Sequence, residues 1–430
     1  MTRTSLYLHP RDEILQAMER IYRYRMTTTS GGNLSIREAN GDTWITPARV
    51  DKGALTRDDI VRVRPDGALE GHRRPSSELP IHRQIRDLRP ELGGIVHAHP
   101  VALVAFSLAH EIPNTRLFHQ AWGVCGPAGF APYELPGSEA LGARVAETFA
   151  QGFDSVILEN HGVVTAGATL QDAFNRFETL EFTAKTIIKA RLLGGEIHFL
   201  SDEQLAIVRQ AEVALDEFDA GPPSSEEIEV RQRLCDFIRR AYRQRLFIST
   251  QGSFSARIDE RSFVITPRQV DRGTADVEDL VLVRDGFCER GKSPSRAAAA
   301  HETIYRRHPE IGAIVNAYPV NATAFSVTGT PLDTRTIPES YVVIREACRA
   351  GFGVQFGDGR ELAELVGRRS RCVILENDGV LVTGGDVLEA FDRLEVLEST
   401  AEAIINCGAI GTVRHLGEEV TRGLDEAFGL

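Results

Sequence analysis

The sequence predicts an α/β protein built from two similar domains in tandem. Amphipathic helical patterns alternate with short β-rich segments, and the same order of segments occurs twice within 430 residues. A chain of this length can bury two full hydrophobic cores. We place the first domain at residues 1–218, a linker rich in Gly, Pro and Ser at residues 219–225, and the second domain at residues 226–430.

The elements of the first domain follow from apolar periodicity and from turn residues. Residues 11–22 carry apolar side chains at helical spacing, which predicts an amphipathic opening helix. A glycine-rich turn leads into a strand at residues 29–37, and a proline ends the short β segment at 42–47. The remaining predicted elements are a strand at 60–63, a helix after 75–78, a strand at 93–100, a helix beyond it, a strand at 156–162 and a long amphipathic helix at 170–193.

The second domain repeats these segments in the same order. The matched pairs of segments are 45–53 with 265–273, 93–100 with 312–319, and 156–162 with 373–379. Co-linear similarity over this length is far beyond chance. The protein is therefore predicted to be a tandem duplication.

Composition limits the possible partners and the compartment. The net charge of −12 and the pI of about 5.6 argue against a nucleic-acid or anionic-membrane surface as the main partner. The six cysteines are scattered without a Cys-x-x-Cys pair, which favours a reduced compartment over a disulfide framework. The sequence has neither an apolar signal core at its start nor an apolar run of membrane-spanning length. We expect a soluble, cytoplasmic protein.

Two histidines lie at the end of the apolar strand predicted at residues 93–100. Side chains alternate faces along a strand, so His97 and His99 project from the same face. Two adjacent imidazoles are half of a metal site, and His161, which ends a second apolar strand, is the candidate third ligand. The alternative is that these are polar residues where buried strands meet solvent.

Comparison of the two copies separates scaffold from site. The Thr-Pro, Leu-Glu-Asn and Ala-Phe segments are kept in both copies, as packing and turns demand. The candidate site residues change together: His97 to Asn316, His99 to Tyr318, His161 to Asp378, Glu78 to Ala297 and Asn33 to Ser253. Coordinated loss is expected if these residues share one function that the second copy no longer performs.

Three neutral imidazoles that leave a coordination position open are typical of a catalytic metal site. Zn²⁺ is the expected ion, and nitrogen ligands also admit Mn²⁺, Fe²⁺ or Co²⁺. Such an ion acts as a Lewis acid that polarises a carbonyl and stabilises a developing enolate. Glu78 is the candidate acid–base if desolvation raises its pKa. The alternative is an ordinary carboxylate at a helix N-terminus, which would lower that pKa.

Candidate anion-binding residues lie in the glycine turn and before the helix that follows Glu78. Gly32 and Asn33 are in the turn, and Ser76 and Ser77 precede the helix. Backbone N–H groups in such places bind phosphates or carboxylates. The alternative is that these residues only form the turn and cap the helix N-terminus.

These motifs together resemble the class II aldolase/adducin family. The motifs are Gly-Asn-x-Ser, Ile-Thr-Pro, Pro-Ser-Ser-Glu, His-Ala-His-Pro and a later His-Gly, all in the first half. The resemblance implies a three-layer α/β/α domain around a mostly antiparallel sheet, with His97, His99 and His161 as metal ligands and Glu78 as acid–base. It also implies active sites between neighbouring subunits, so we expect a homodimer or higher homo-oligomer with a pseudo-four-fold arrangement of halves.

Two departures from the family pattern narrow the activity. Phosphosugar aldolases of the family usually have Thr-Gly near the position of Ala48 and Arg49, and Arg49 could bind an anion bidentately instead. Family epimerases usually have Asp in place of Glu78. The sequence therefore favours a carbon–carbon lyase that cleaves or joins a small anionic hydroxy-carbonyl substrate. Open alternatives are a decarboxylase of an aromatic or hydroxy acid, a non-catalytic adducin-like scaffold and an Fe²⁺-dependent oxidative enzyme.

Overall fold

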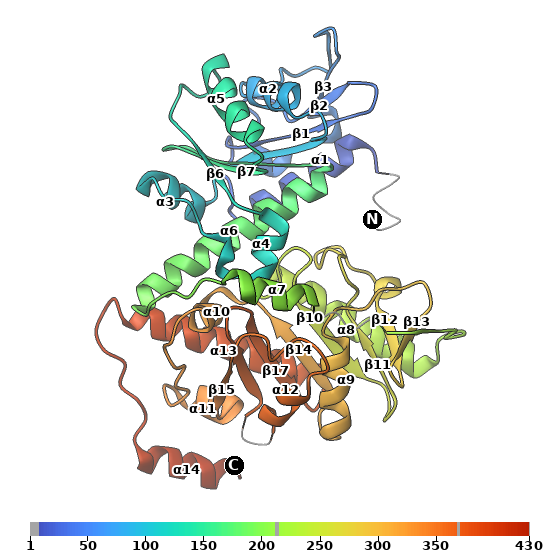
Figure 1. The fold of residues 1–430 in the computed structure, drawn as a ribbon, viewed down its shortest axis with the longest axis vertical. Helices are drawn as coiled ribbons and strands as arrows, with labels where there is room; N and C mark the ends of the chain where they lie inside the picture. The colour runs from blue at the N-terminus through green and yellow to red at the C-terminus, as the bar shows by residue number, and fades with distance from the viewer. Residues whose placement is uncertain (1–7, 211–214, 368–369, 430) are drawn as a thin grey trace. The chain divides into compact units, whose positions relative to one another are not determined.

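The computed structural model describes residues 8–210, 215–367 and 370–429. The chain divides into two compact units (Figure 1). Unit 1 comprises residues 1–116 and 120–185, and unit 2 comprises residues 117–119 and 186–430. The sequence-based domain boundaries and the linker at 219–225 stay a prediction.

The described residues of unit 1 form an eight-stranded sheet in the order β4-β3-β2-β1-β5-β8-β7-β6. Neighbouring strands are antiparallel except for the parallel pair β6 and β7. The strands are β1 (Asn33–Arg37), β2 (Thr43–Ile45), β3 (Val61–Val63), β4 (Leu69–Glu70), β5 (Gly94–Ala98), β6 (Gly129–Ala131), β7 (Ser155–Leu158) and β8 (Gly162–Gly167).

Helices cover both faces of this sheet (Figure 1). The helices are α1 (Pro10–Arg23), α2 (Leu79–Leu88), α3 (Val101–Ala109), α4 (His119–Cys125), α5 (Glu139–Ala150) and α6 (Leu170–Leu193), with 3₁₀ turns at Lys52–Ala54, Arg57–Asp59 and Thr115–Leu117. On one face α2 and α5 pack together, and Ile85 and Phe149 join Ile95 of β5 in a buried cluster. On the other face Leu170 of α6 approaches Gly94 so closely that a Cβ there would be 2.3 Å from the Leu170 nitrogen. This three-layer α/β/α arrangement is the predicted one.

The described residues of unit 2 form a nine-stranded sheet in the order β15-β16-β17-β14-β10-β11-β12-β13-β9. The pairs β15–β16 and β13–β9 are parallel, and the other neighbours are antiparallel. The strands are β9 (Glu217–Phe218), β10 (Ser253–Arg257), β11 (Ser262–Ile265), β12 (Val281–Arg284), β13 (Phe287–Glu289), β14 (Ala313–Ala317), β15 (Ala347–Ala350), β16 (Cys372–Leu375) and β17 (Gly379–Gly384). The helices are α7 (Asp202–Gln210), α8 (Ser225–Arg243), α9 (Ala298–Arg307), α10 (Val320–Ser326), α11 (Pro338–Ile344), α12 (Arg360–Leu365), α13 (Val387–Cys407) and α14 (Glu418–Phe428), with a 3₁₀ turn at Val277–Asp279.

The two sheets share their strand registers, which confirms the tandem duplication. Ser35 pairs with Ile45 across β1 and β2, and Ser255 pairs with Ile265 across β10 and β11. The two copies also share an unusual backbone conformation: Arg49 and its counterpart Gln269 have positive φ values of 54° and 58°. The shared scaffold makes side-chain differences between the copies directly comparable.

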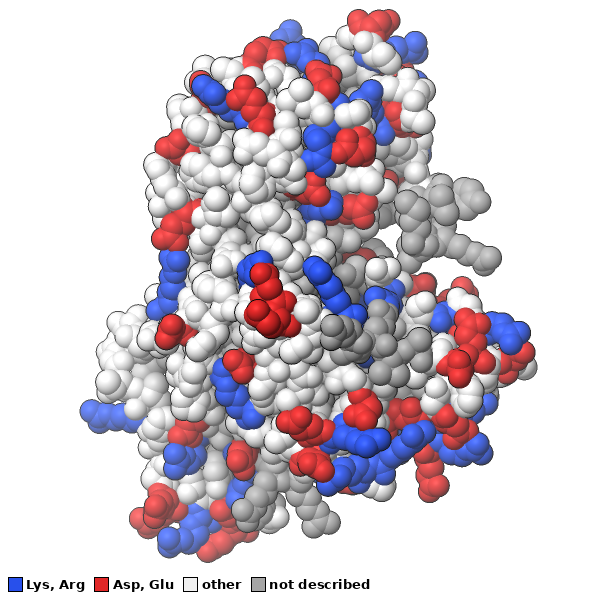
Figure 2. Space-filling view, in the orientation of Figure 1, with Lys and Arg blue, Asp and Glu red and all other residues white. Residues whose placement is uncertain are grey.

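Lys and Arg side chains intermingle with Asp and Glu side chains over the face of the molecule drawn in Figure 2. All six cysteines are free thiols. Of the helices within the described residues, none combines the length and apolar character that crossing a membrane requires.

The packing of α5 on the sheet of unit 1 gives a stability prediction. Phe149 is fully buried, so Phe149→Ala should lower the free energy of unfolding of this unit by about 3–5 kcal/mol. Urea denaturation followed by fluorescence measures the effect. Phe428→Ala is the control, because Phe428 is 60% exposed and its loss should change stability by less than about 0.5 kcal/mol. Equal effects of the two substitutions would contradict the assignment of this core.

Candidate metal centre

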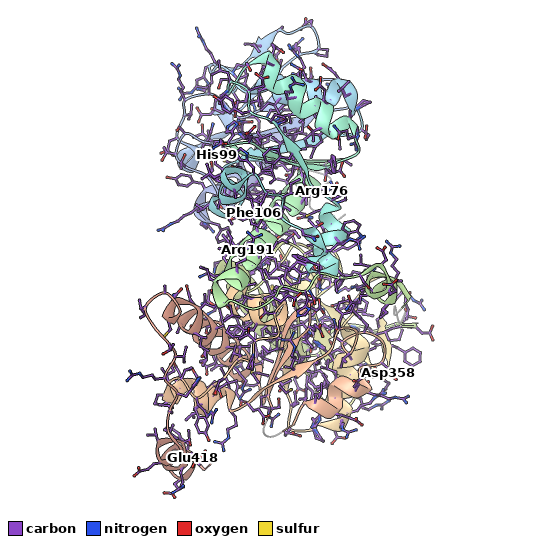
Figure 3. The ribbon with its side chains drawn as sticks, turned by 60° about the vertical axis from the view of Figure 1, so that its left-hand side comes forward. His99, Phe106, Arg176, Arg191, Asp358 and Glu418 are labelled. Carbon is purple, nitrogen blue, oxygen red and sulfur yellow. The ribbon has the colours of Figure 1, made fainter. Side chains whose placement is uncertain are left out.

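His97 and His99 lie at the end of β5, a central strand between β1 and β8. Their imidazole centroids are 4.8 Å apart and their Nε2 atoms are 3.1 Å apart, so both rings lie on one face as the sequence predicts. His99 directly precedes Pro100, the N-cap residue of α3, which is the helix that carries Phe106 (Figure 3). The strand end therefore fixes two imidazoles close to each other.

His161 joins this pair from the tight turn between β7 and β8. Asn160 has a positive φ of 52°, and the backbone N–H of His161 donates to the carbonyl of Leu158 at 3.1 Å. Gly162 lies so close to β5 that an added Cβ would be 2.6 Å from the Ala98 carbonyl oxygen. The His161 ring centroid is 4.9 Å from that of His97 and 5.0 Å from that of His99. The structure thus brings the three predicted histidines together.

The three imidazoles are suited to bind a divalent ion. One ring nitrogen of each lies within 4.8 Å of the others. His97 Nδ1 donates to the carbonyl of Val163 at 2.9 Å, which turns its Nε2 lone pair toward the other rings. Burial and the neighbouring His97 lower the pKa of His99 to about 3 and that of His161 to about 4. The Glu78 carboxylate outweighs burial and raises the pKa of His97. Metal binding displaces the proton of an imidazole, so three ring nitrogens this close together fit the group that the sequence implies.

Glu78 lies beside the imidazoles at the N-cap position of α2 and is buried. Its Oε2 is 3.2 Å from His97 Nε2, and its Oε1 is 3.4 Å from His161 Nε2. Burial raises the pKa of Glu78, but its interactions with His97 and His161 and the hydrogen bond from Asn33 outweigh burial and hold that pKa below its usual range. Glu78 is therefore a carboxylate, and its pKa shifts in the direction that the sequence analysis gave for a carboxylate at a helix N-terminus rather than in the direction of desolvation.

A series of hydrogen-bonded, buried polar side chains contacts Oε2 of Glu78. Asn33 Nδ2 donates to Glu78 Oε2 at 2.7 Å, and Asn33 Oδ1 is 2.5 Å from His82 Nε2. His82 Nδ1 is 2.6 Å from Ser35 Oγ, which also contacts Arg86. Sequence reasoning identified Asn33 but missed His82 and Arg86. The repeat held a signal for His82, because the second copy keeps a histidine, His301, at the corresponding position.

The predicted anion-binding residues lie on adjoining turns. A Cβ at Gly32, whose φ is 73°, would be 2.9 Å from the His97 carbonyl oxygen. Ser76 is buried, and its Oγ accepts from the Glu78 backbone N–H at 3.2 Å. Ser77 and Arg49 have exposed side chains. Among the described residues, Gly32, Asn33 and Ser76 thus lie next to the imidazoles or Glu78. No described contact links Ser77 or Arg49 to these groups.

Lys52 is a buried cation that the sequence analysis did not single out. It is 3% exposed, and its Nζ donates to the carbonyl of Pro47 at 2.6 Å. Its backbone N–H donates to the carbonyl of Thr29, just before the glycine turn. Burial lowers the pKa of Lys52 to about 8, so the side chain is mostly protonated at neutral pH. A buried positive charge therefore lies between the glycine turn and the turn that carries Arg49.

The residues that replace the imidazoles in the second copy bond to one another. Tyr318 donates its hydroxyl hydrogen to Asp378 Oδ1 at 3.0 Å, and His119 Nε2 is 3.1 Å from the same oxygen. Asn316 Oδ1 is 2.6 Å from His301 Nε2. Within the described parts of the chain, His97, His99 and His161 form the one cluster suited to a metal. The second copy keeps the scaffold with a different set of polar contacts.

An α/β/α domain with three imidazoles and a carboxylate at the end of a central strand defines a class of metal-dependent enzyme domains. The family described as Class II Aldolase and Adducin N-terminal domain matches residues 12–188 and again residues 232–405. The chain belongs to this family, with two tandem domains of which the second has lost the imidazoles. It is an aldolase-like lyase.

Characterised relatives have similar sequences over one domain length. An L-fuculose phosphate aldolase of Methanococcus maripaludis is 32% identical over 174 residues, which is 40% of this chain and 93% of that protein. A 3-oxo-tetronate 4-phosphate decarboxylase of Haemophilus influenzae is 30% identical over 202 residues, covering 46% of this chain and 95% of that protein. A solved structure of a putative aldolase/epimerase/decarboxylase from Escherichia coli is 27% identical and covers 46% of this chain and 97% of that chain, with a TM-score of 0.43.

The geometry predicts where metal binds. The wild-type protein should carry about one divalent ion per chain, and His97→Ala should abolish stoichiometric binding because three protein ligands are needed. Asn316→Ala, at the corresponding position of the second copy, is the matched control and should retain the ion. Elemental analysis of the purified proteins measures both. Full metal content in His97→Ala would remove His97 from the site.

Proposed function

We propose that the first domain is a metal-dependent carbon–carbon lyase that cleaves or joins a small anionic hydroxy-carbonyl compound. The observation that carries the proposal is the convergence of three imidazoles, from the end of β5 and from the turn between β7 and β8, beside the buried carboxylate of Glu78. Similarity to an aldolase and a decarboxylase whose names specify phosphorylated substrates supports it.

His97, His99 and His161 would hold the metal ion, for which we propose Zn²⁺. When bound, such an ion stabilises negative charge that develops on a substrate oxygen as the carbon–carbon bond breaks. The carbonyl of Val163 orients His97, because it accepts from Nδ1 and so fixes the tautomer with a free Nε2. These three side chains come from two strand ends and therefore hold their mutual geometry rigidly.

Glu78 is the proposed acid–base. Its Oε2 accepts from Asn33, whereas its buried Oε1 has no hydrogen-bond partner among the described residues. Oε1 is therefore the atom that would carry the proton exchanged with substrate. A carboxylate placed this way can receive the proton of a hydroxyl group or return a proton to carbon.

The substrate's anionic group would bind beside the glycine turn. Gly32 and Asn33 bring backbone close to the strand end, and Ser76 and Ser77 lead into α2, whose N-terminus favours negative charge. Arg49 and the buried Lys52 add positive charge on the adjoining segments. Among the described residues, the hydrogen-bond partner of Lys52 Nζ is a carbonyl and not a carboxylate. A buried cation of this kind is costly unless a ligand compensates its charge, which supports an anionic substrate.

Decarboxylation is the second candidate reaction. The relative from Haemophilus influenzae is named for a decarboxylation. The same imidazoles and Glu78 would serve, because loss of carbon dioxide also leaves negative charge next to a carbonyl. Release of carbon dioxide rather than an aldehyde distinguishes the two reactions.

We also propose a cytoplasmic homodimer or higher homo-oligomer with a pseudo-four-fold arrangement of halves. The free state of all six cysteines supports a reducing compartment. The fused pair of related domains supports the arrangement of halves, because two chains would supply four copies of one fold.

The role of Glu78 gives a kinetic prediction. Glu78→Gln keeps the shape but removes the proton acceptor, so turnover should fall by about 10²–10⁴-fold while the metal remains bound. Aldehyde and carbon dioxide release are measured with a panel of phosphorylated and carboxylated hydroxy-carbonyl compounds. Turnover at the wild-type rate would exclude Glu78 from the reaction.

The buried charge of Lys52 gives a prediction for substrate binding. Lys52→Met should raise KM for the anionic substrate by about tenfold or more, because a charge-assisted contact is lost. Lys52→Arg is the control: it keeps the charge, and the second copy carries a buried arginine, Arg272, at this position. An unchanged KM in Lys52→Met would show that Lys52 does not bind the substrate.

A further inference from the structure

Three buried side chains connect Arg86 to Glu78 through four hydrogen bonds. Arg86 Nη2 is 2.7 Å from Ser35 Oγ, which is 2.6 Å from His82 Nδ1. His82 Nε2 is 2.5 Å from Asn33 Oδ1, and Asn33 Nδ2 is 2.7 Å from Glu78 Oε2. Each of the five residues, Arg86 and Glu78 included, is at most 8% exposed. Water therefore does not compete for these bonds.

The direction of the bonds in this relay follows from Arg86 together with the neutral state of His82. A guanidinium only donates, so Ser35 Oγ accepts from Arg86. Among the described residues, His82 Nδ1 is the other partner of this hydroxyl, so the hydroxyl hydrogen is directed to Nδ1. Burial lowers the pKa of His82 well below its usual range, so the ring is neutral and its one proton is on Nε2. The Nε2–H of His82 then needs a hydrogen-bond acceptor, which is the amide oxygen of Asn33. The amide nitrogen of Asn33 is left to face Glu78 Oε2.

The second copy shows what happens without the cation. Tyr305 replaces Arg86, and its hydroxyl is 2.8 Å from Ser255 Oγ, a pair in which either oxygen can donate. His301 keeps the place of His82, at 2.7 Å from Ser255 Oγ, but its Nε2 faces Asn316. The carboxylate of Glu78 has become Ala297. Both charged ends are lost together, whereas the serine and histidine between them remain.

The fold itself does not require a cation at this position. Tyr305 occupies the equivalent place on α9 in a sheet of the same register, and it is as well buried as Arg86. Arg86 also donates to the carbonyls of Leu92 and Gly93, and no carboxylate is among its hydrogen-bond acceptors in the described structure. A buried guanidinium is costly, so its retention only where Glu78 is present points to a role in the site.

We propose that Arg86 is a positioning residue that acts on Glu78 through Ser35, His82 and Asn33. The relay orients the Asn33 amide so that Glu78 Oε2 accepts its hydrogen bond, and Oε1 remains as the atom that exchanges the proton with substrate. The inference rests on the proposed acid–base role of Glu78. It assigns a direction to the relay and distinct tasks to the two carboxylate oxygens.

The tautomer of His82 tests the direction of the relay without any turnover. ¹⁵N NMR of the full chain with labelled histidine, assigned by the signal missing in His82→Leu, should show a neutral ring with its proton on Nε2. A proton on Nδ1, or a doubly protonated ring, would reverse or break the relay and overturn the proposal. This result is independent of whether Glu78 acts in catalysis, so failure of the proposed function remains distinguishable.

Kinetics test the effect on the site with a matched pair of variants. His82→Leu and His301→Leu each remove a fully buried histidine that is bonded to a serine, so both should lower the melting temperature to a similar extent. Only His82→Leu should lower kcat, by about 10–100-fold, with KM and metal content near wild type. An equal loss of kcat in both variants, or an unchanged kcat in His82→Leu, would overturn the proposal.

Arg86→Tyr covers the case in which His82→Leu fails to fold, because the second copy accommodates a tyrosine there. It should lower kcat by about tenfold or more while metal content stays near wild type, and Arg86→Lys, which also only donates, should recover most of the loss. Wild-type kcat in Arg86→Tyr would show that Arg86 serves packing alone. Failure of Arg86→Lys to recover any activity would equally contradict a role based on donation.

Discussion

The antiparallel register between β1 and β5 is the constraint on which the site depends. It pairs Asn33 directly with His97, so the amide that holds Glu78 and the first imidazole lie side by side across two strands. A shift of one residue would turn His97 to the opposite face and separate it from His99 and Glu78. The register is fixed by a buried apolar strand, since every residue of β5 is buried. Core packing thus determines the positions of the polar groups.

The comparison of the two domains shows which parts of the site depend on one another. The second sheet preserves the register, placing Ser253 opposite Asn316, yet the imidazoles, Glu78 and Arg86 have all been replaced. Their replacements are satisfied locally, as Asp378 accepts from Tyr318 and lies beside His119. Loss of one charge in a buried site leaves its partners uncompensated, so such groups change together. The duplicated scaffold therefore carries one intact set of charged groups.

Much of the fold and part of the site could be predicted from sequence, and the reasons are specific. His97 and His99 were recognisable because a strand has a period of two, and His161 because it follows a similar strand. Arg86 and Lys52 were not recognisable, and His82 was marked only by the matching His301 of the second copy, because the significance of these residues lies in burial and in partners far along the chain. The direction of the Glu78 pKa shift was also beyond the sequence. It depends on a balance between burial and the interactions of Glu78 with His97, His161 and Asn33, which requires distances.

The central claim is that three imidazoles of the first domain hold a metal ion that the second domain cannot hold. Crystals of the purified protein, measured by anomalous diffraction at the absorption edge of the bound metal, test it most directly. The account predicts a strong peak between His97, His99 and His161 and none between Asn316, Tyr318 and Asp378. Absence of a peak at the three imidazoles of metal-loaded protein, or peaks of equal height in both domains, would contradict it.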